Sequence, residues 1–286
     1  SVFTTGSAKV APGSTGEELG LIITGDTMVE PSEDVTLTLS SSQADYITFA
    51  STPSHVRTIT NDDLVAPYFI GSSASLNEGA SGQTASAVKF TWDQVIAANV
   101  PSLNLSVASA CAANGCTLAQ DINYSASETV SIFTTGTQKA SPGSTGESAG
   151  LTIAGDTLVE PSEVVSLSLS DGGSAYIDTS ANPGFDFTIT NDDQVVPYFV
   201  AASSTVLEGD TGATAAPIAL TWDQDIAANA DSLSLSIDAS CVANGCDLAA
   251  DSNFSSNQSL SIFTTGSALT SPGVSGVDVG LTLDGD

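Results

Sequence analysis

Positively charged residues are nearly missing from this sequence, which has four Lys and Arg residues against 33 Asp and Glu and a formal net charge of −29. Without a basic patch to neutralise phosphates, we expect the chain to bind neither nucleic acid nor anionic membrane surfaces. Long apolar runs are missing too: no stretch approaches the roughly 18 residues that a membrane-spanning helix needs. We therefore expect no membrane insertion.

Catalytic side chains are equally scarce. The only histidine is His55, which we interpret as a surface loop residue, and it leaves no Ser-His-Asp or Cys-His set. Paired carboxylates could serve as the acid and base of a glycosidase. In this sequence, however, the carboxylates lie beside predicted turns in near-identical copies, with no sign of a specialised cleft. We therefore do not expect an enzyme.

Internal repetition is the dominant feature that is present, and its period of 130 residues is that of a whole domain. The recurring segments are 1–6 at 131–136 and 261–266, 67–69 at 197–199, and 91–94 at 221–224. We predict three units: 1–63, the C-terminal part of a first repeat; 64–193, a complete repeat; and 194–286, the N-terminal part of a third. The connections are short, so neighbouring repeats should lie nearly end to end. Because residue 1 falls in the middle of a repeat, we expect a window on a longer protein, or a processed piece of one.

Apolar and polar residues alternate along many short segments of the complete repeat, including 88–92, 103–107, 129–133, 165–169 and 187–189. Such alternation predicts half-buried strands, and Gly- and Pro-rich turns separate them. The fold class is therefore all-β, with tandem antiparallel β-sandwich domains of an immunoglobulin-like kind. Residues 93–99 could form one helical turn. Trp92 shares the face of Phe90, which favours a place in the core over one in a glycan-binding surface.

Four cysteines form two identical patterns. Cys111 and Cys116 flank an Asn-Gly pair, as do Cys241 and Cys246. Asn-Gly favours a tight hairpin turn, which places the flanking cysteines opposite each other, so we predict two local disulfides. Zinc ligation would need further Cys or His nearby. Disulfides indicate an oxidising, extracellular setting.

Many of the acidic residues recur in fixed clusters at the two ends of a β segment. One cluster comprises Asp156, Glu160, Glu163, Asp192 and Asp193; an earlier copy comprises Asp26, Glu30, Glu33, Asp62 and Asp63; and Asp286 begins a third. If the strand ends converge at one pole of the sandwich, five carboxylates meet there. Calcium takes six to eight oxygen ligands and tolerates the irregular geometry of loops, so we predict Ca²⁺ sites. The alternative is a solvated acidic rim or a salt-adapted surface.

The pattern Gly-Asp-x-x-x-Glu-x-x-Glu, followed by a strand and by Ile-Thr-Asn-Asp-Asp, resembles the Calx-β family of calcium-binding β-sandwiches, over residues 64–193 and both partial repeats. The resemblance implies further metal ligands: Glu78 and Glu208, each before a glycine, and Asp121 and Asp251, each three residues before an aromatic residue. The cysteine pairs are similar to those of the extracellular arrays of the family rather than of its intracellular sensors.

Together these features predict a calcium-stabilised structural or adhesive repeat segment of a long secreted bacterial surface protein or fibre, located outside the cell or at its surface. Its expected partners are the neighbouring repeats of the same chain. One alternative is a module that binds a glycan or a cell surface, for which Tyr68, Tyr198 and the two tryptophans are the candidate aromatic residues. Another is a self-assembling filament subunit, in which a neighbouring copy donates strands to the incomplete terminal sandwiches.

Overall fold

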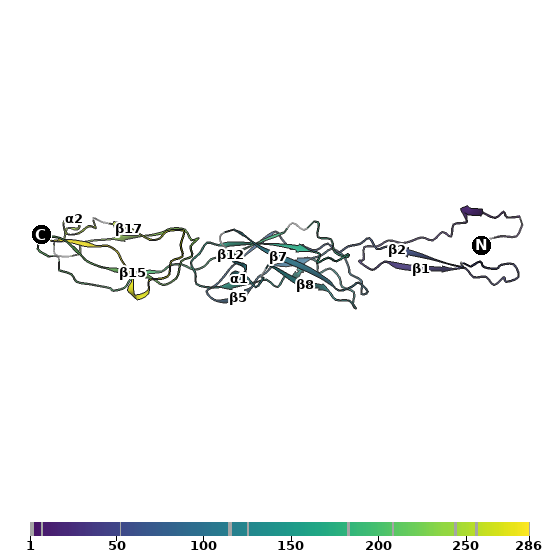
Figure 1. Cartoon of the computed structure of the whole chain (residues 1–286), viewed down its shortest axis with the longest axis horizontal. Coiled ribbons are helices and arrows are strands. Elements are labelled where there is room, and N and C mark those ends of the chain that lie inside the picture. The colour runs from purple at the N-terminus through teal and green to yellow at the C-terminus, as the bar shows by residue number, and fades with distance from the viewer. Residues whose placement is uncertain are drawn as a thin grey trace.

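The structure, a computed structural model, describes residues 3–6, 8–51, 53–113, 116–124, 126–181, 184–207, 209–242, 245–254 and 257–285. Nearly all of its regular structure is β-strand, which confirms the predicted all-β class. The molecule is elongated, and an N-terminal segment, a central body and a C-terminal body follow one another along its long axis (Figure 1).

The central body is built around a five-stranded sheet. Its spatial order is β4 (Ser73–Asn77), β12 (Phe185–Thr190), β11 (Glu163–Ser170), β7 (Leu103–Ala113) and β8 (Ser127–Phe133). All neighbours are antiparallel except β4 and β12, which are parallel, with Leu76 opposite Ile189. Because these two strands run in the same direction, both end at the same pole of the sheet, and β11 begins there.

Shorter strands form the second layer. One sheet contains β3 (Tyr68–Phe69), β6 (Lys89–Thr91) and β9 (Glu147–Ser148), and another pairs β5 (Gly82–Ala85) with β10 (Thr152–Gly155). The connections include a 3-10 turn, η2 (Gly143–Thr145), and a single helical turn, α1 (Leu118–Asp121). No helix among the described residues combines the length and the apolar character needed to cross a bilayer.

The core lies between these layers, and strand alternation explains its composition. Leu105 of β7, Leu167 of β11 and Phe187 of β12 are buried, whereas Ser168 of β11 points to solvent. Trp92 is fully buried, as predicted, so its ring is not available for stacking on a ligand. The antiparallel sheets and their shared core confirm the predicted β-sandwich.

The two terminal parts repeat pieces of this body. The N-terminal segment has η1 (Gly13–Thr15) and the pair β1 (Glu33–Thr38) and β2 (Ser54–Ile59). The C-terminal body has β13 (Pro197–Phe199), β14 (Gly212–Ala215), β15 (Ala219–Trp222), β16 (Leu233–Asp238), α2 (Leu248–Asp251), β17 (Asn257–Phe263), η3 (Gly273–Ser275), β18 (Val277–Asp278) and β19 (Thr282–Gly285). Its sheets are β13-β15-β18, β14-β19 and β16-β17.

Two sequence predictions about local structure were wrong. Residues 93–99 form no helical turn, because the backbone of Ile96 is extended and forms bridges with both Val29 and Lys139. The helical turns are instead α1 and α2. His55 is exposed, as expected, but it lies in β2 rather than in a loop.

A valine from each repeat enters the core of the next. The Val29 amide donates to the Val95 carbonyl (2.9 Å) and its carbonyl accepts from Ala97 (2.9 Å), while its side chain is buried in the central core. Val159 makes the equivalent bonds to Asp225 (3.0 Å) and Ala227 (2.9 Å) in the C-terminal body and packs on the cluster around Trp222. Each joint is thus held by backbone hydrogen bonds and apolar packing.

Both predicted disulfides are present, Cys111–Cys116 and Cys241–Cys246, with Cα–Cα distances of 5.5 and 5.6 Å. Cys111 lies near the end of β7, opposite Val165 of β11, whereas Cys116 lies outside the strands and leads into α1. The predicted Asn-Gly turns involve residues 114, 115 and 244, which lie outside the described part of the chain.

Removing the first disulfide should destabilise the central body modestly. A loop this short contributes about 2 kcal/mol in the chain-entropy estimate. We expect the double substitution Cys111→Ser/Cys116→Ser to lower the free energy of unfolding by about that amount, as measured by urea denaturation with the second disulfide intact. An unchanged midpoint with an unchanged slope would show that the disulfide adds no stability.

Candidate metal centre

The topology of the main sheet brings acidic residues from distant parts of the sequence to one pole. Glu78 follows the end of β4, Asp192 and Asp193 follow the end of β12, and Glu163 begins β11. These three strands are neighbours, and the parallel pairing of β4 with β12 places both of their ends beside the start of β11. Sequence spacing alone does not show this pairing.

The first group at this pole consists of Glu78, Asp156 and Asp193. One carboxylate oxygen from each lies within 4.8 Å of the others. Glu78 is only 5% exposed and Asp193 only 8%. Glu78 Oε1 and Asp193 Oδ2 are inaccessible and accept no hydrogen bond from any described residue. Buried carboxylate oxygens without a donor are costly, so a positively charged partner would stabilise this group.

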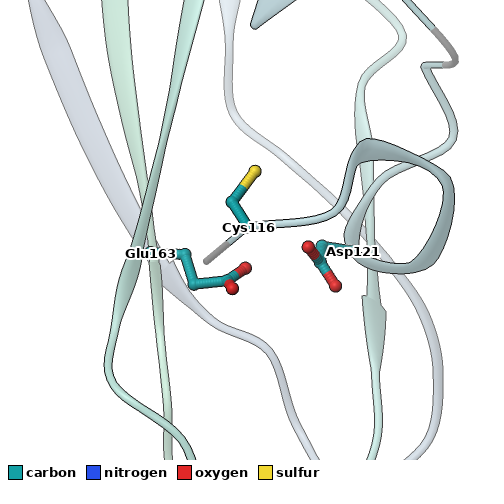
Figure 2. Close-up of side chains that lie close together, drawn as sticks. All are labelled: Cys116, Asp121 and Glu163. Atoms are coloured by element: carbon teal, nitrogen blue, oxygen red, sulfur yellow. The ribbon is translucent and has the colours of Figure 1, made fainter. Parts of the chain in front are cut away.

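The second group contains Asp121 from α1, Glu163 from β11, and Cys116. Figure 2 shows the carboxyl groups of Asp121 and Glu163 facing each other, with Cys116 beside them, and ligand atoms of all three lie within 4.8 Å of one another. The Cys116 sulfur belongs to a disulfide, so it is no candidate ligand. Glu163 is 3% exposed, and its Oε2 also accepts no hydrogen bond within the described structure. Asp121 accepts a bond from the Thr117 amide, which fixes the helical turn.

Burial and the repulsion of neighbouring charges raise the pKa values of three glutamates at this pole. Burial first, and then the charges of Glu160, Asp156, Asp193 and Asp192, raise the pKa of Glu78 to about 8. Burial, Asp156, Asp121 and Asp193 raise the pKa of Glu160 to about 7. Burial and the hydrogen bond with Asp121 hold the pKa of Glu163 well above its usual range. Each of the seven predicted carboxylates of the complete repeat therefore either has a raised pKa or contributes a charge that raises one.

Local hydrogen bonds fix several members of the cluster. Asp156 Oδ1 accepts from the Leu158 amide (2.7 Å), and Asp192 Oδ1 accepts from the Gly79 amide (3.1 Å). A Cβ at Gly155 would overlap the backbone carbonyl of Gly79, so glycine is required for Asp156 to approach Glu78. The Gly155-Asp156 pair and the Glu78-Gly79 pair therefore lie next to each other in the structure.

The terminal repeats hold parts of the same arrangement. Asp26, Glu30, Glu33, Asp62 and Asp63 line one hollow in the N-terminal segment. Burial, followed by the charges of Glu33, Asp26 and Asp63, raises the pKa of Glu30. In the C-terminal body, Asp251 ends α2 and accepts from the Asp247 amide (2.7 Å), as Asp121 does in α1. Glu208 and Asp286 lie outside the described residues.

Two residues near the pole were not predicted as part of it. The Asn191 side chain donates to the Asp193 carbonyl (3.0 Å) and shapes the Asn-Asp-Asp turn. Gln224, from the C-terminal body, donates to Asp193 Oδ1 (3.2 Å). Gln224 belongs to a recurring segment, because residues 91–94 recur at 221–224. No pattern in the sequence, however, shows that its side chain contacts the preceding repeat.

The cluster can chemically hold a hard cation. Its donors are carboxylate oxygens with neither histidine nor free thiol, which suits calcium better than zinc. The ion pairs formed among the described residues are Lys9–Glu17 and Lys139–Glu147, so no basic side chain neutralises the pole there. The orphaned oxygens of Glu78, Glu163 and Asp193 are therefore places where a cation fits.

The class of molecule defined so far is a tandem β-sandwich with an acidic pole. No protein-family model and no curated protein matches the sequence. Among solved structures, the chain is similar to the calcium binding domain CBD12 of CALX1.1, with a TM-score of 0.31 and 9% identity over 77% of this chain and 76% of that one. It is also similar to CBD12 from CALX1.2, with a TM-score of 0.29 and 11% identity over 77% and 74% of the two chains.

Proposed function

We propose that this chain is a calcium-stabilised structural segment of a tandem-repeat protein. One observation carries the proposal: at the pole of the central repeat, Glu78, Glu163 and Asp193 each bury a carboxylate oxygen that no described residue satisfies. Glu78, Asp156, Asp193, Glu163 and Asp121 would hold the ion or ions, and Glu160 and Asp192 would add charge. A bound cation supplies the missing positive charge and holds the strand ends together.

Calcium is proposed over other cations because of the donor set and its setting. The carboxylates come from strand ends, a helical turn and the loop after β10, so their geometry is irregular. Calcium tolerates irregular coordination, whereas magnesium requires a near-ideal octahedron and keeps several waters. The N-terminal cluster around Glu30 is proposed as an equivalent site.

The location and role in the cell are proposed from the disulfides and the tandem arrangement. Disulfides form and persist in oxidising compartments, which supports a place outside the cell. The joints at Val29 and Val159 connect consecutive bodies by backbone bonding, so each repeat would act as a spacer in a rod. We assign the segment to a secreted bacterial surface protein or fibre, where calcium would stiffen the rod and any adhesive domain would lie elsewhere.

Substituting one buried ligand tests the metal site directly. Glu78→Gln keeps the size of the side chain but removes one charge from the first group, so we expect the calcium Kd of the central pole to rise roughly 10-fold or more. The Kd would be measured by titrating the full chain with calcium and following the Gly79 and Leu158 amide resonances, whose protons bond to Asp192 and Asp156.

A matched control is Glu128→Gln, which removes one charge from β8 outside the cluster. Its Kd should stay close to that of the original chain. If calcium moves neither resonance in the original chain, the proposed function is wrong. If Glu78→Gln and Glu128→Gln weaken binding equally, calcium responds only to the net charge and the assignment of Glu78 is wrong.

A further inference from the structure

A residue of the next repeat contacts the acidic pole of the central repeat. Gln224 follows β15 in the C-terminal body, and its Nε2 donates to Asp193 Oδ1 at 3.2 Å. The same side chain lines a hollow of about 370 Å³ together with Asp156, another member of the first carboxylate group. Gln224 therefore faces the cluster of a repeat to which it does not belong.

The backbone around Gln224 is held in place from both sides. Asp223 Oδ1 accepts from the Val196 amide (2.9 Å), and Asp225 Oδ1 accepts from the Ser271 amide (2.8 Å). The Asp225 carbonyl accepts from Val159 (3.0 Å), within the turn that carries Asp156 and Glu160. These bonds fix the backbone on both sides of Gln224, so less conformational entropy is lost when its side chain contacts Asp193.

The other end of the amide provides a second observation. Gln224 Oε1 is inaccessible and, within the described structure, has no hydrogen-bond donor; the same is true of Asp193 Oδ2. At the first joint, Gln94 occupies the equivalent place after β6, and its Oε1 is likewise buried without a donor. A glutamine whose buried Oε1 has no donor among the described residues therefore occurs after the equivalent strand in both bodies.

We propose that Gln224 is a positioning residue for the cation site of the preceding repeat. Its N–H holds Asp193 through Oδ1 and leaves Oδ2 for the cation, so the site of one repeat is completed by the repeat that follows. A ligand oriented by such an outer hydrogen bond binds metal more tightly, and losing the bond typically costs 10- to 100-fold in affinity. This inference rests on the proposed calcium site.

The test is a double-mutant cycle in the full chain, with calcium alone as the ligand. Gln224→Leu keeps the bulk of the side chain but removes the donor, and Asp193→Ala removes its acceptor. We expect Gln224→Leu to raise the calcium Kd about 10-fold or more in the original chain. In the Asp193→Ala background we expect almost no further change, because the bond acts through the Asp193 carboxylate. The Gly79 and Leu158 amide resonances report this site.

The matched control is Gln258→Leu, the same substitution on β17 in the same body. It should leave the Kd unchanged. If Gln224→Leu binds calcium as tightly as the original chain, or loses the same factor with and without the Asp193 carboxylate, the inference is overturned while the calcium site stands. If the original chain itself binds no calcium, the proposed function fails first.

Discussion

The full chain should unfold at a clearly higher temperature in millimolar calcium than in excess EGTA. A ligand that binds only the folded state stabilises it by about 2.7 kcal/mol at 100 times its Kd and by about 4.1 kcal/mol at 1,000 times. Without calcium, the buried oxygens of Glu78, Glu163 and Asp193 have no hydrogen-bond donor among the described residues, and this destabilises the folded pole. A bound ion would supply the missing positive charge, so the gain in stability should be largest in the central body. Calorimetry at matched ionic strength, with both disulfides intact, measures the shift.

Magnesium at the same concentration is the control. The irregular set of carboxylates should hold it poorly, so its shift should be a small fraction of that of calcium. Equal shifts in the two cations would show general screening of the −29 charge rather than a site. Superimposable curves in calcium and EGTA would mean that the acidic pole is a solvated rim, and that the chain is a spacer without metal.

Much of the fold could be predicted from the sequence because the evidence for it is local. Alternation along residues 103–107 and 165–169 predicts strands with one buried face, and the structure buries Leu105 and Leu167 as expected. The repeated Cys-x-x-x-x-Cys pattern is short enough to fix its own pairing. A period of 130 residues identifies the repeating unit without any knowledge of its topology.

The arrangement at the pole depends on contacts that no local pattern contains. Glu78 reaches Asp193 because β4 runs parallel to β12, although more than 100 residues separate the two carboxylates. From the sequence, residues 93–99 could form one helical turn, yet the backbone of Ile96 is extended and forms bridges with Val29 and Lys139. The contact of Gln224 with the acidic pole could not be predicted either, because its partner Asp193 lies in another repeat. For residues 93–99, tertiary context outweighs a weak local preference.

The same acidic pole predicts an unusual pH dependence for the calcium-free chain. Glu78 and Glu160 have folded pKa values of about 8 and 7, against an ordinary 4.5. Between pH 4.5 and 8 the folded state therefore binds more protons than the unfolded state, so stability falls as pH rises. This stabilisation is fully present below pH 4.5 and is lost as pH rises through 7 and 8. In EGTA, we expect the melting temperature to be several degrees higher at pH 5.5 than at pH 8.

Saturating calcium should reverse this trend, because the ion binds ionised carboxylates and protons compete with it. The melting temperature in calcium should therefore fall as pH drops from 8 to 5.5, and the difference between the calcium and EGTA curves should shrink. In the matched variant Glu78→Gln, which cannot titrate at that position, the pH dependence in EGTA should be shallower. A calcium-free chain that becomes more stable as pH rises through this window would contradict the buried, mutually repelling cluster at the ends of β4 and β12.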